Sequence, residues 1–538
     1  MTTAMKKIKL NILLVCVCLL VLSSCSSFLD INHNPNQPTS LGTPDYILTG
    51  AIVASGQIQA VDLASFSGYW AGYWAASGSY SQAGDLTRNY NLTFNWLPYG
   101  VNATFAGTEP SQQLQAWALL FNNASNYNYA EHNAKNLKNY DYYQAIAKIM
   151  KVWCFHSLVD VYGNVPYTSA FGGLGNLVPS YDDAQTVYKN LSLQLDSAVT
   201  IIQNAPATVV NVNPHTDAIF GGNMSSWVAM ANTLNLRLLL RQSEVTTAAT
   251  QTFIQQELTK INANGGGFLG AGQDALIQPG YTKIQDLQNP FWENNGLSAA
   301  NAIGGRDYNR ISNFSLNFFL NNNDPRADYL FRLPGDAPGV NSKLTGNSAA
   351  YAGIDFGELP LTADATPYTS SFGIGVLGGP SQPLPFITAA ESLFLQAEAA
   401  QRTWISGSPQ TFFESGITES FRYLGVPNYA AAASTYYGQP LADVNWGASS
   451  TNLMHAIITQ KWAAMTSINC MEAWCDIRRL INTPSGVSVP LSIDPTVTST
   501  VAPVRLLYPL SEYSNNAAAV NAQGTISQFT SKIFWDVH

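Results

Sequence analysis

Four amphipathic segments follow one another between residues 127 and 244, and this succession constrains the fold more than any other feature of the chain. The first is the end of a helix over 127–137, and the others cover 140–161, 180–203 and 225–244. Apolar residues recur in each segment at spacings of three and four, which places them on one helical face. Helices of this length in tandem predict a layer of antiparallel helix pairs.

Helical periodicity is interrupted between residues 265 and 383, where Gly, Pro, Asn and Asp are frequent, and it returns from residue 384. Loops and short strands are expected in the interruption. The predicted fold class is mostly α, with tetratricopeptide-like helix pairs forming a scaffold over about 115–245 and 384–480. A loop-rich, irregular half would carry the ligand site. The repeats do not follow the strict consensus of that repeat type. We expect one domain over 45–538.

The last long helix is expected over about 453–480, before Pro484. Glu472, Asp476 and Arg479 stand at positions i, i+4 and i+7, so they share one helical face. Opposite charges at this spacing predict an ion-pair network.

The stretch 158–171 is expected to form a rigid corner between two helices. Gly163 can adopt the left-handed conformation that ends a helix, and Pro166 holds the preceding residue extended. We expect Tyr162 and Tyr167 to lock helix pairs together there, not to contact a ligand.

Residues 1–24 have the pattern of a lipoprotein signal peptide. Three lysines stand in the first nine residues, and the next 13 are apolar except for Asn11. This run is short for a membrane-spanning helix and typical of a signal peptide. It ends in Leu-Ser-Ser before Cys25, which predicts lipidation of Cys25 and a stable membrane anchor. A plain signal peptide with a chance cysteine is the alternative. Residues 25–44 are expected to be an extended tether.

The charge of the chain disfavours nucleic acid as a partner. The net charge is -9 at pH 7, and removal of the three N-terminal lysines makes it -12. Only 11% of the residues are charged, against 12% aromatic residues. Acidic proteins without basic clusters are poor nucleic-acid binders, whereas this composition suits neutral polar ligands. The mature chain would keep three cysteines, an odd number that predicts no disulfide framework.

Ten aromatic residues stand between residues 66 and 99, separated by small and polar residues. Flat rings can cover the apolar face of a sugar while polar side chains bind its hydroxyls. We therefore consider these candidate ligand-binding residues: Trp70, Tyr73, Trp74, Tyr80 and Trp96, with Trp292 and Tyr308 from the loop-rich part. On this interpretation, replacing Trp70 or Trp74 by Ala would weaken binding without unfolding. Core packing of the rings is the alternative.

Motifs for catalysis are scarce. The chain has no G-x-S-x-G, H-E-x-x-H or Walker A motif, and its six histidines lack metal-ligand spacing. Gly265, Gly267 and Gly270 match the dinucleotide pattern, but they follow a predicted helix, not a strand. We therefore predict no catalytic residue, no metal site and no cofactor. Paired carboxylates for glycoside cleavage need no sequence motif, so a surface glycoside hydrolase stays an alternative.

Seven short stretches, in order, resemble the SusD/RagB family of outer-membrane lipoproteins, most closely its second SusD-like subfamily. They are the lipobox with Phe28-Leu-Asp-Ile-Asn-x-Asn-Pro-Asn, the corner 158–170 with Tyr181-Asp-Asp-Ala-Gln, Asp217-Ala-Ile-Phe-Gly-Gly with Trp227 and Asn232-Thr-Leu-Asn-Leu-Arg, Asp324-Pro-Arg, the helix from Glu391 to Trp404, Glu472-Ala-Trp-x-Asp-x-Arg-Arg and Arg505-x-x-Tyr-Pro.

The resemblance implies a mostly helical surface lipoprotein that faces the cell exterior. It also implies a partner, a SusC-like TonB-dependent β-barrel transporter, over which the protein closes as a lid during import. The ligand would be an oligosaccharide, or a peptide as in some family members. The binding residues of the family form no portable motif, so none is transferred to this sequence.

Overall fold

The structure is a computed structural model that describes residues 44–77, 90, 116–304, 307–359 and 361–538. The predicted signal peptide, Cys25 and all of the predicted tether except Pro44 lie outside these residues. The helices are α2 (Pro44–Gln57), α3 (Ala64–Trp70), α5 (Ala116–Asn136), α6 (Asp141–Tyr162), α7 (Ala184–Gln203), α8 (Met224–Arg241), α9 (Ala248–Ala263), α10 (Pro290–Asn295), α11 (Asn313–Asn321), α12 (Ala327–Leu330), α13 (Ala389–Gln401), α14 (Pro409–Tyr423), α15 (Tyr429–Tyr437), α16 (Leu453–Ala464), α17 (Cys470–Arg479), α18 (Leu510–Asn515) and α19 (Ala517–Asn521). The strands are β1 (Trp74–Ala76), β2 (Ala275–Ile277), β3 (Asn309–Ile311), β4 (Phe331–Arg332), β5 (Ser371–Phe372) and β6 (Leu384–Ile387).

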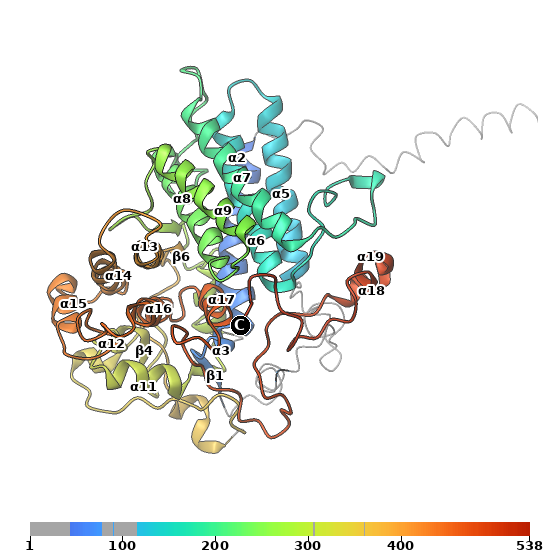
Figure 1. The fold of residues 1–538 in the computed structure, drawn as a ribbon. Coiled ribbons are helices and arrows are strands. Elements are labelled where there is room, and N and C mark those ends of the chain that lie inside the picture. Colours follow the sequence, from blue (N-terminus) through green and yellow to red (C-terminus); the bar gives the residue numbers. More distant parts are fainter. Residues whose placement is uncertain (1–43, 78–89, 91–115, 305–306, 360) are drawn as a thin grey trace, which may run out of the picture. The chain divides into compact units, whose positions relative to one another are not determined.

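The predicted mostly α fold is confirmed. Helices α5 to α8 pack in succession, each against the next, as the periodicity predicts (Figure 1). Helix α13 packs against α14 and α16 in the second helical region. We call residues 116–263 and 389–479 the helical half, and residues 265–383 with β1 and the segment 489–494 the loop-rich half. Helices α9 and α15 were not predicted, because their apolar stripes are short.

The first described helix is a core element. Helix α2 continues through a π-helical stretch (Ile58–Leu63) into α3. Among the described residues, this 27-residue helix is the one long and apolar enough to cross a membrane, but 61% of its apolar window is buried inside the protein. It contacts α5, α6, α17 and the strands β1, β2 and β6, so its hydrophobicity is explained by core packing.

The expected helix 453–480 is two helices, which corrects the prediction. Helix α16 ends at Ala464 and α17 begins at Cys470. Between them Ser467 has a φ of 58°, which a continuous helix does not allow. The side chain of Asn469 then accepts a hydrogen bond from the backbone N–H of Glu472 and caps the new helix.

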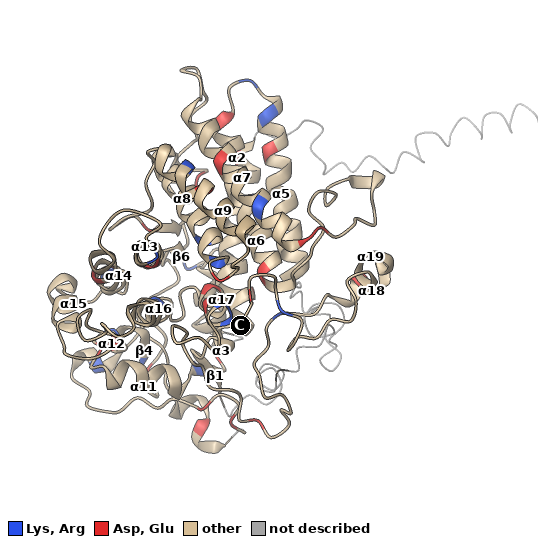
Figure 2. Cartoon of the chain, viewed as in Figure 1, with Lys and Arg blue, Asp and Glu red and all other residues tan. Residues whose placement is uncertain are grey.

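The predicted ion-pair network on α17 is confirmed, and it reaches further than α17. Glu472 pairs with Arg241 and lies 3.5 Å from Arg237, both on α8. Asp476 lies 2.7 Å from Lys461 and 3.1 Å from Arg479. Charged positions are sparse along the ribbon, and several gather around α17 (Figure 2). The network fixes which helices are neighbours.

The corner follows the prediction in part: Gly163 ends α6 at a positive φ, but its ψ of -122° lies outside the left-handed helical region that the sequence predicts. Gly163 has a φ of 78°, and its N–H closes α6 by donating to the carbonyl of Val159. Tyr162 is fully buried, with its ring against Trp117 and Tyr508, so its predicted locking role is confirmed.

Three two-stranded antiparallel sheets order the loop-rich half and its border. They are β1–β3, β2–β6 and β4–β5. In the first, Trp74 pairs with Ile311 and Ala75 with Arg310, which joins the chain after α3 to the loop-rich half. All three described cysteines, Cys154, Cys470 and Cys475, are free and buried.

Candidate functional site

The structure places Trp70, Tyr73 and Trp74 in the core, with exposed fractions of 3%, 0% and 1%. Trp70 packs on Trp474 at 5.3 Å, and Tyr73 stacks on Trp462 at 5.1 Å. The interpretation of these three rings as an exposed platform is therefore corrected. Helical spacing placed them together, but the face they share points inward. Replacing Trp74 by Ala would open a core cavity, at a cost of about 3–5 kcal/mol in stability.

Two of the other four candidates, Trp292 and Tyr308, lie among the described residues. Tyr80 and Trp96 lie outside the described residues. Trp292 is 7% exposed, and Tyr308 is half-buried, with a carbonyl that accepts a hydrogen bond from the backbone N–H of Ser77.

An open cleft of about 260 Å³ lies in the loop-rich half, and we call it the insert cleft. Four segments that are distant in sequence line it: the turn before β1, the start of α11, the loop at 355–356 and the segment 490–493. Its volume is close to the lower end of the range for small-molecule pockets, about 300 Å³. The cleft can therefore hold part of an extended ligand.

One wall of the insert cleft is fixed by the start of α11. The hydroxyl of Ser312 donates to the carbonyl of Gly72, and the N–H of Ser312 donates to the carbonyl of Tyr73 at 3.0 Å. Asn313 donates from its backbone to Ile354 at 2.9 Å. These hydrogen bonds hold the start of α11 between the turn before β1 and the loop at 354–356.

The opposite wall is held by backbone contacts of the segment 490–493. The N–H of Ile493 donates to the carbonyl of Phe356 at 3.0 Å, and the N–H of Ser492 donates to the hydroxyl of Tyr90 at 2.9 Å. Burial raises the pKa of Tyr90 to about 12, so this hydroxyl stays protonated at neutral pH. Both walls are thus preorganised.

The chemistry of the insert cleft suits a sugar. Phe314 is half-buried, with its ring edge-on to Trp462 at 5.4 Å, so the rest of the ring can face a ligand. Asp355 is exposed, and its Oδ1 accepts a hydrogen bond from Asn313 at 2.8 Å. Its Oδ2 has no hydrogen-bond donor among the described residues. An aromatic face can cover the C–H groups of a sugar, and a carboxylate accepts hydroxyl protons.

Sequence reasoning missed this cleft. None of the five predicted ligand residues that the structure describes lines it, and Phe314, Asp355 and Phe356 were not predicted. They come from loops and from the first turn of a short helix, where no periodic pattern marks a binding residue. The sequence predicted a ligand site in the loop-rich half, but it did not predict which side chains line that site.

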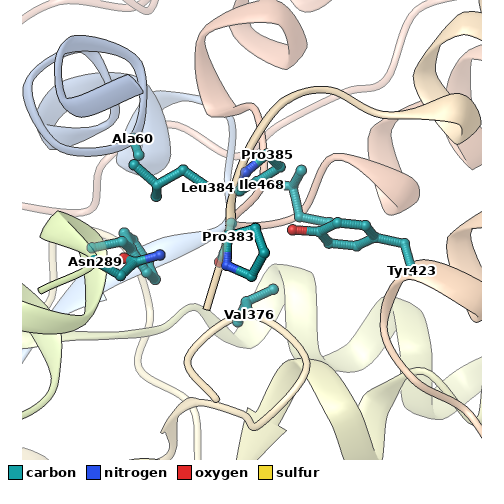
Figure 3. Close-up of a pocket in the computed structure, with 10 residues that line it drawn as sticks. Ala60, Asn289, Val376, Pro383, Leu384, Pro385, Tyr423 and Ile468 are labelled. Carbon is teal, nitrogen blue, oxygen red and sulfur yellow. The ribbon is translucent and has the colours of Figure 1, made fainter. Parts of the chain in front are cut away.

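A second cavity lies where the π-helical stretch, the approach to β6 and α14 meet (Figure 3). Pro383 stands between Asn289 and Tyr423 in it, and Ala60 and Leu384 close another side. Its volume is about 10 Å³, enough for a single water molecule. It is therefore a packing defect and not a glycan site.

One group of potential metal ligands exists among the described residues: His156, Asp160 and Glu472, all buried. The negative charges of Asp160 and Glu472 are already partly balanced by Arg241. Its guanidinium pairs with Glu472 and lies 3.6 Å from Asp160. Asp160 also accepts hydrogen bonds from Tyr188 and Trp535. These contacts make the three residues part of the ion-pair network.

Comparison with known proteins gives the family. The SusD-like family model described as "Starch-binding associating with outer membrane" matches residues 74–509. The chain belongs to this SusD-like family. No curated protein matches it. The family description associates these proteins with starch and with the outer membrane.

Solved structures of SusD homologues share the fold of this SusD-like protein. A chitin-binding SusD homologue from Flavobacterium johnsoniae has 23% identity and a TM-score of 0.69, and the match covers 91% of this chain and 99% of that one. A homologue from Bacteroides uniformis has 22% identity and a TM-score of 0.69, with coverage of 92% and 100%. One from Bacteroides thetaiotaomicron has 20% identity and a TM-score of 0.67, with coverage of 91% and 98%. At these identities the likeness establishes the fold alone.

Proposed function

We propose that this SusD-like protein binds an oligosaccharide in the insert cleft and does not cleave it. One observation carries the proposal: the half-exposed ring of Phe314 and the unpaired carboxylate oxygen of Asp355 line the same open cleft. The family description and the chitin-binding homologue support a glycan as the ligand class.

We further propose that the protein is lipidated at Cys25, faces the cell exterior and delivers the glycan to a SusC-like TonB-dependent β-barrel transporter, acting as its lid. The signal sequence and the family's association with the outer membrane support this role. A SusC-like barrel encoded beside this chain, and copurifying with it in detergent, is the expected result. A barrel that purifies without this chain would contradict the lid role.

Two other functions are favoured by particular features. The apolar side chains of Leu491 and Ile493, 36% and 60% exposed, together with Asp355 would suit a peptide with basic and apolar residues. A hydrolase would need a protonated carboxyl near a second carboxylate. Burial, and then the carboxylates of Asp364 and Asp355, raise the pKa of Glu358 above its ordinary value, which is the direction that a general acid requires.

Calorimetry with chito- and malto-oligosaccharides tests the glycan proposal. Phe314→Ala should weaken binding about tenfold, because a stacked ring contributes up to about 1.5 kcal/mol. Asp355→Asn should weaken binding while leaving the packing of the wall intact. Tyr368→Ala is the matched control, since that ring is 60% exposed in the same half but does not line the cleft.

Three outcomes would contradict the proposal. Unchanged affinity in both variants, with thermal unfolding showing intact folds, would remove the insert cleft as the site. New reducing ends released by the pure wild-type protein would favour the hydrolase. Retention of mixed peptides, with no binding of glycans, would favour the peptide receptor.

A further inference from the structure

A larger open cleft lies in the helical half, beside the corner between α6 and α7, and we call it the corner cleft. Its volume is about 450 Å³, within the range of small-molecule sites. The loop between α6 and α7 that borders it and the helix α11 of the insert cleft stand apart in Figure 1, so these are two separate clefts. The predicted purely structural role of Tyr167 is incomplete, because Tyr167 lines the corner cleft.

Aromatic rings form the apolar part of the corner cleft. Phe155 is 1% exposed; the ring of Tyr167 meets it edge-on at 4.8 Å, and that of Phe171 lies 5.8 Å from it. Tyr167 and Phe171 are half-buried, so part of each ring stays open to the cleft. The hydroxyl of Tyr167 makes no hydrogen bond with the described part of the chain. Burial, and then Glu131 and Asp182, raise its pKa to about 12, so it can donate as well as accept.

Two amide side chains face the cleft in an orientation that lysines impose. Lys148 donates to Oε1 of Gln194 at 2.6 Å, and Lys151 donates to Oδ1 of Asn128 at 3.0 Å. An ammonium group has no acceptor, so each amide must turn its oxygen toward the lysine and its NH₂ away from it. Over the described ranges, neither amide nitrogen donates to the protein, which leaves both as donors for a ligand.

The lysines are themselves held in place by a shared carboxylate. Glu131 lies 2.9 Å from Lys148 and 2.6 Å from Lys151. Burial opposes ionisation of Glu131, but the two ammonium groups outweigh burial and hold its pKa below the ordinary value. The lysines therefore serve to orient the amides, and Glu131 compensates one of their two positive charges.

The wall that carries Tyr167 is rigid. Asp182 accepts hydrogen bonds from the backbone N–H groups of Tyr167 and Thr168, both at 2.9 Å, and from the Thr168 hydroxyl at 2.8 Å. Its own N–H donates to the carbonyl of Val165 at 2.9 Å. A site held in this way loses little conformational entropy when a ligand binds.

We propose that the corner cleft is a second binding site for a neutral oligosaccharide, in which Tyr167 and Phe171 cover a sugar ring and the amides of Asn128 and Gln194 donate to its hydroxyl or N-acetyl oxygens. This inference rests on the proposed function, because it assumes that the protein captures glycans. Two sites on separate faces would let one protein hold a long glycan at two points.

Calorimetry in a background without the first site tests the inference. The double variant Phe314→Ala, Asp355→Asn should keep residual binding of the chito- or malto-oligosaccharides. Adding Gln194→Glu replaces the NH₂ donor with an oxygen that Lys148 can still pair with, and adding Tyr167→Phe removes only the hydroxyl. Together these changes should reduce the residual affinity at least tenfold. Leu174→Ser is the control, because Leu174 is 93% exposed on the same loop and does not line the cleft.

The outcomes separate the two proposals. Residual binding that is unchanged by Gln194→Glu and Tyr167→Phe overturns the second site and leaves the first intact. A double variant that binds no glycan, while the wild type binds, also overturns the second site. A wild-type protein that binds no oligosaccharide overturns the proposed function, and the second site with it. Thermal unfolding of every variant shows whether a loss of binding reflects a loss of fold.

Discussion

Side chains from several helices of the helical half meet in one buried cluster of charges, whereas the polar contacts of the loop-rich half are mostly made between neighbours in sequence. In the helical half, Arg241 of α8 pairs with Glu472 of α17, and Arg479 of α17 lies 2.6 Å from Glu398 of α13. In the loop-rich half, Arg326 pairs with Asp324, only two residues away, at 2.6 Å.

The loop-rich half is ordered in addition by side chains that bond to the backbone. The amide of Asn341 donates to the carbonyls of Asp328 and Phe331 and so closes a loop around β4. Glycines at positive φ, such as Gly357, let two loops approach closely. The helical half thus depends on buried charge pairs between helices, and the loop-rich half on backbone geometry and on close approach between loops, so different substitutions should damage each half.

The largest expected effect is the loss of one charge from the helical cluster. Glu472→Ala removes the carboxylate that pairs with the buried guanidinium of Arg241 and lies 3.5 Å from Arg237, which keeps its pair with Glu391. The loss should cost about 3–5 kcal/mol in the free energy of unfolding. Urea denaturation measures it. Lys135→Ala, at an exposed position near the end of α5, should stay within about 0.5 kcal/mol. Similar losses of unfolding free energy in both variants would mean that the buried charge cluster contributes no more to stability than an exposed charge does.

A second substitution tests local geometry in the loop-rich half. Gly357→Ala would place a Cβ 2.1 Å from Oγ of Ser492 at a φ of +93°. Gly346→Ala is the matched control, with a φ of +99° and no atom within 4 Å of the added Cβ. Both should lose about 1–2 kcal/mol from the left-handed backbone, and Gly357→Ala about 1–3 kcal/mol more from the clash. If Gly357→Ala and Gly346→Ala unfold at the same denaturant concentration, the close approach of Ser492 is not what requires glycine at position 357.

Acid should weaken the helical cluster. Burial alone would raise the pKa of Asp160, but Arg241 and the hydrogen bond from His156 outweigh it and lower the pKa to about 2. An unfolded Asp has a pKa of about 3.9. The stability from Asp160 is therefore complete above about pH 4 and is lost as the pH falls toward 2. Denaturation from pH 6 to pH 2 measures this loss, and Asp160→Asn should flatten that part of the profile. A wild-type profile as flat as that of the variant would contradict the assignment.

The smallest expected effect is a gain. Asp536 is 3% exposed, and neither of its carboxylate oxygens accepts a hydrogen bond within the described residues. Burial raises its pKa above the ordinary value, although Arg478, Lys532 and His538 oppose the shift. Its ionised form is thus disfavoured in the fold at neutral pH.

Asp536→Asn should therefore raise stability at pH 7 by about 1 kcal/mol, since it removes a buried charge whose oxygens accept no hydrogen bond within the described residues. The gain should shrink as the pH falls and the wild-type carboxyl becomes protonated. Thermal unfolding at pH 7 and pH 4 checks both points. A variant that is less stable at pH 7 would show that the 3.5 Å contact with Lys532 outweighs burial.

Much of the fold could be predicted from the sequence, because helices follow from local spacing. The segments at 140–161, 180–203 and 225–244 became α6, α7 and α8 within a few residues. The shared face of Glu472, Asp476 and Arg479 also followed from the period of the helix. The break at 465–469 did not, because a left-handed Ser467 is compatible with many contexts and is selected by its surroundings.

The candidate sites were much less predictable. Spacing showed that Trp70 and Trp74 stand close together, but it could not show whether they face solvent or Trp474 and Phe372. Phe314 and Asp355 carry no pattern at all, since their proximity is made by hydrogen bonds between loops. Tyr167 was recognised as part of the corner, yet its open edge depends on where Phe155 and Phe171 lie.

The sequence by itself determined the mostly helical fold class and the family, because periodicity and short motifs are local properties. The address that its N-terminus indicates stays a prediction. Only the tertiary structure decided which aromatic rings are core and which side chains line the two clefts. The physical reason is that burial and cleft lining are set by contacts between residues far apart in the chain, as between Gly72, Phe314 and Leu491. Local spacing carries no information about such contacts.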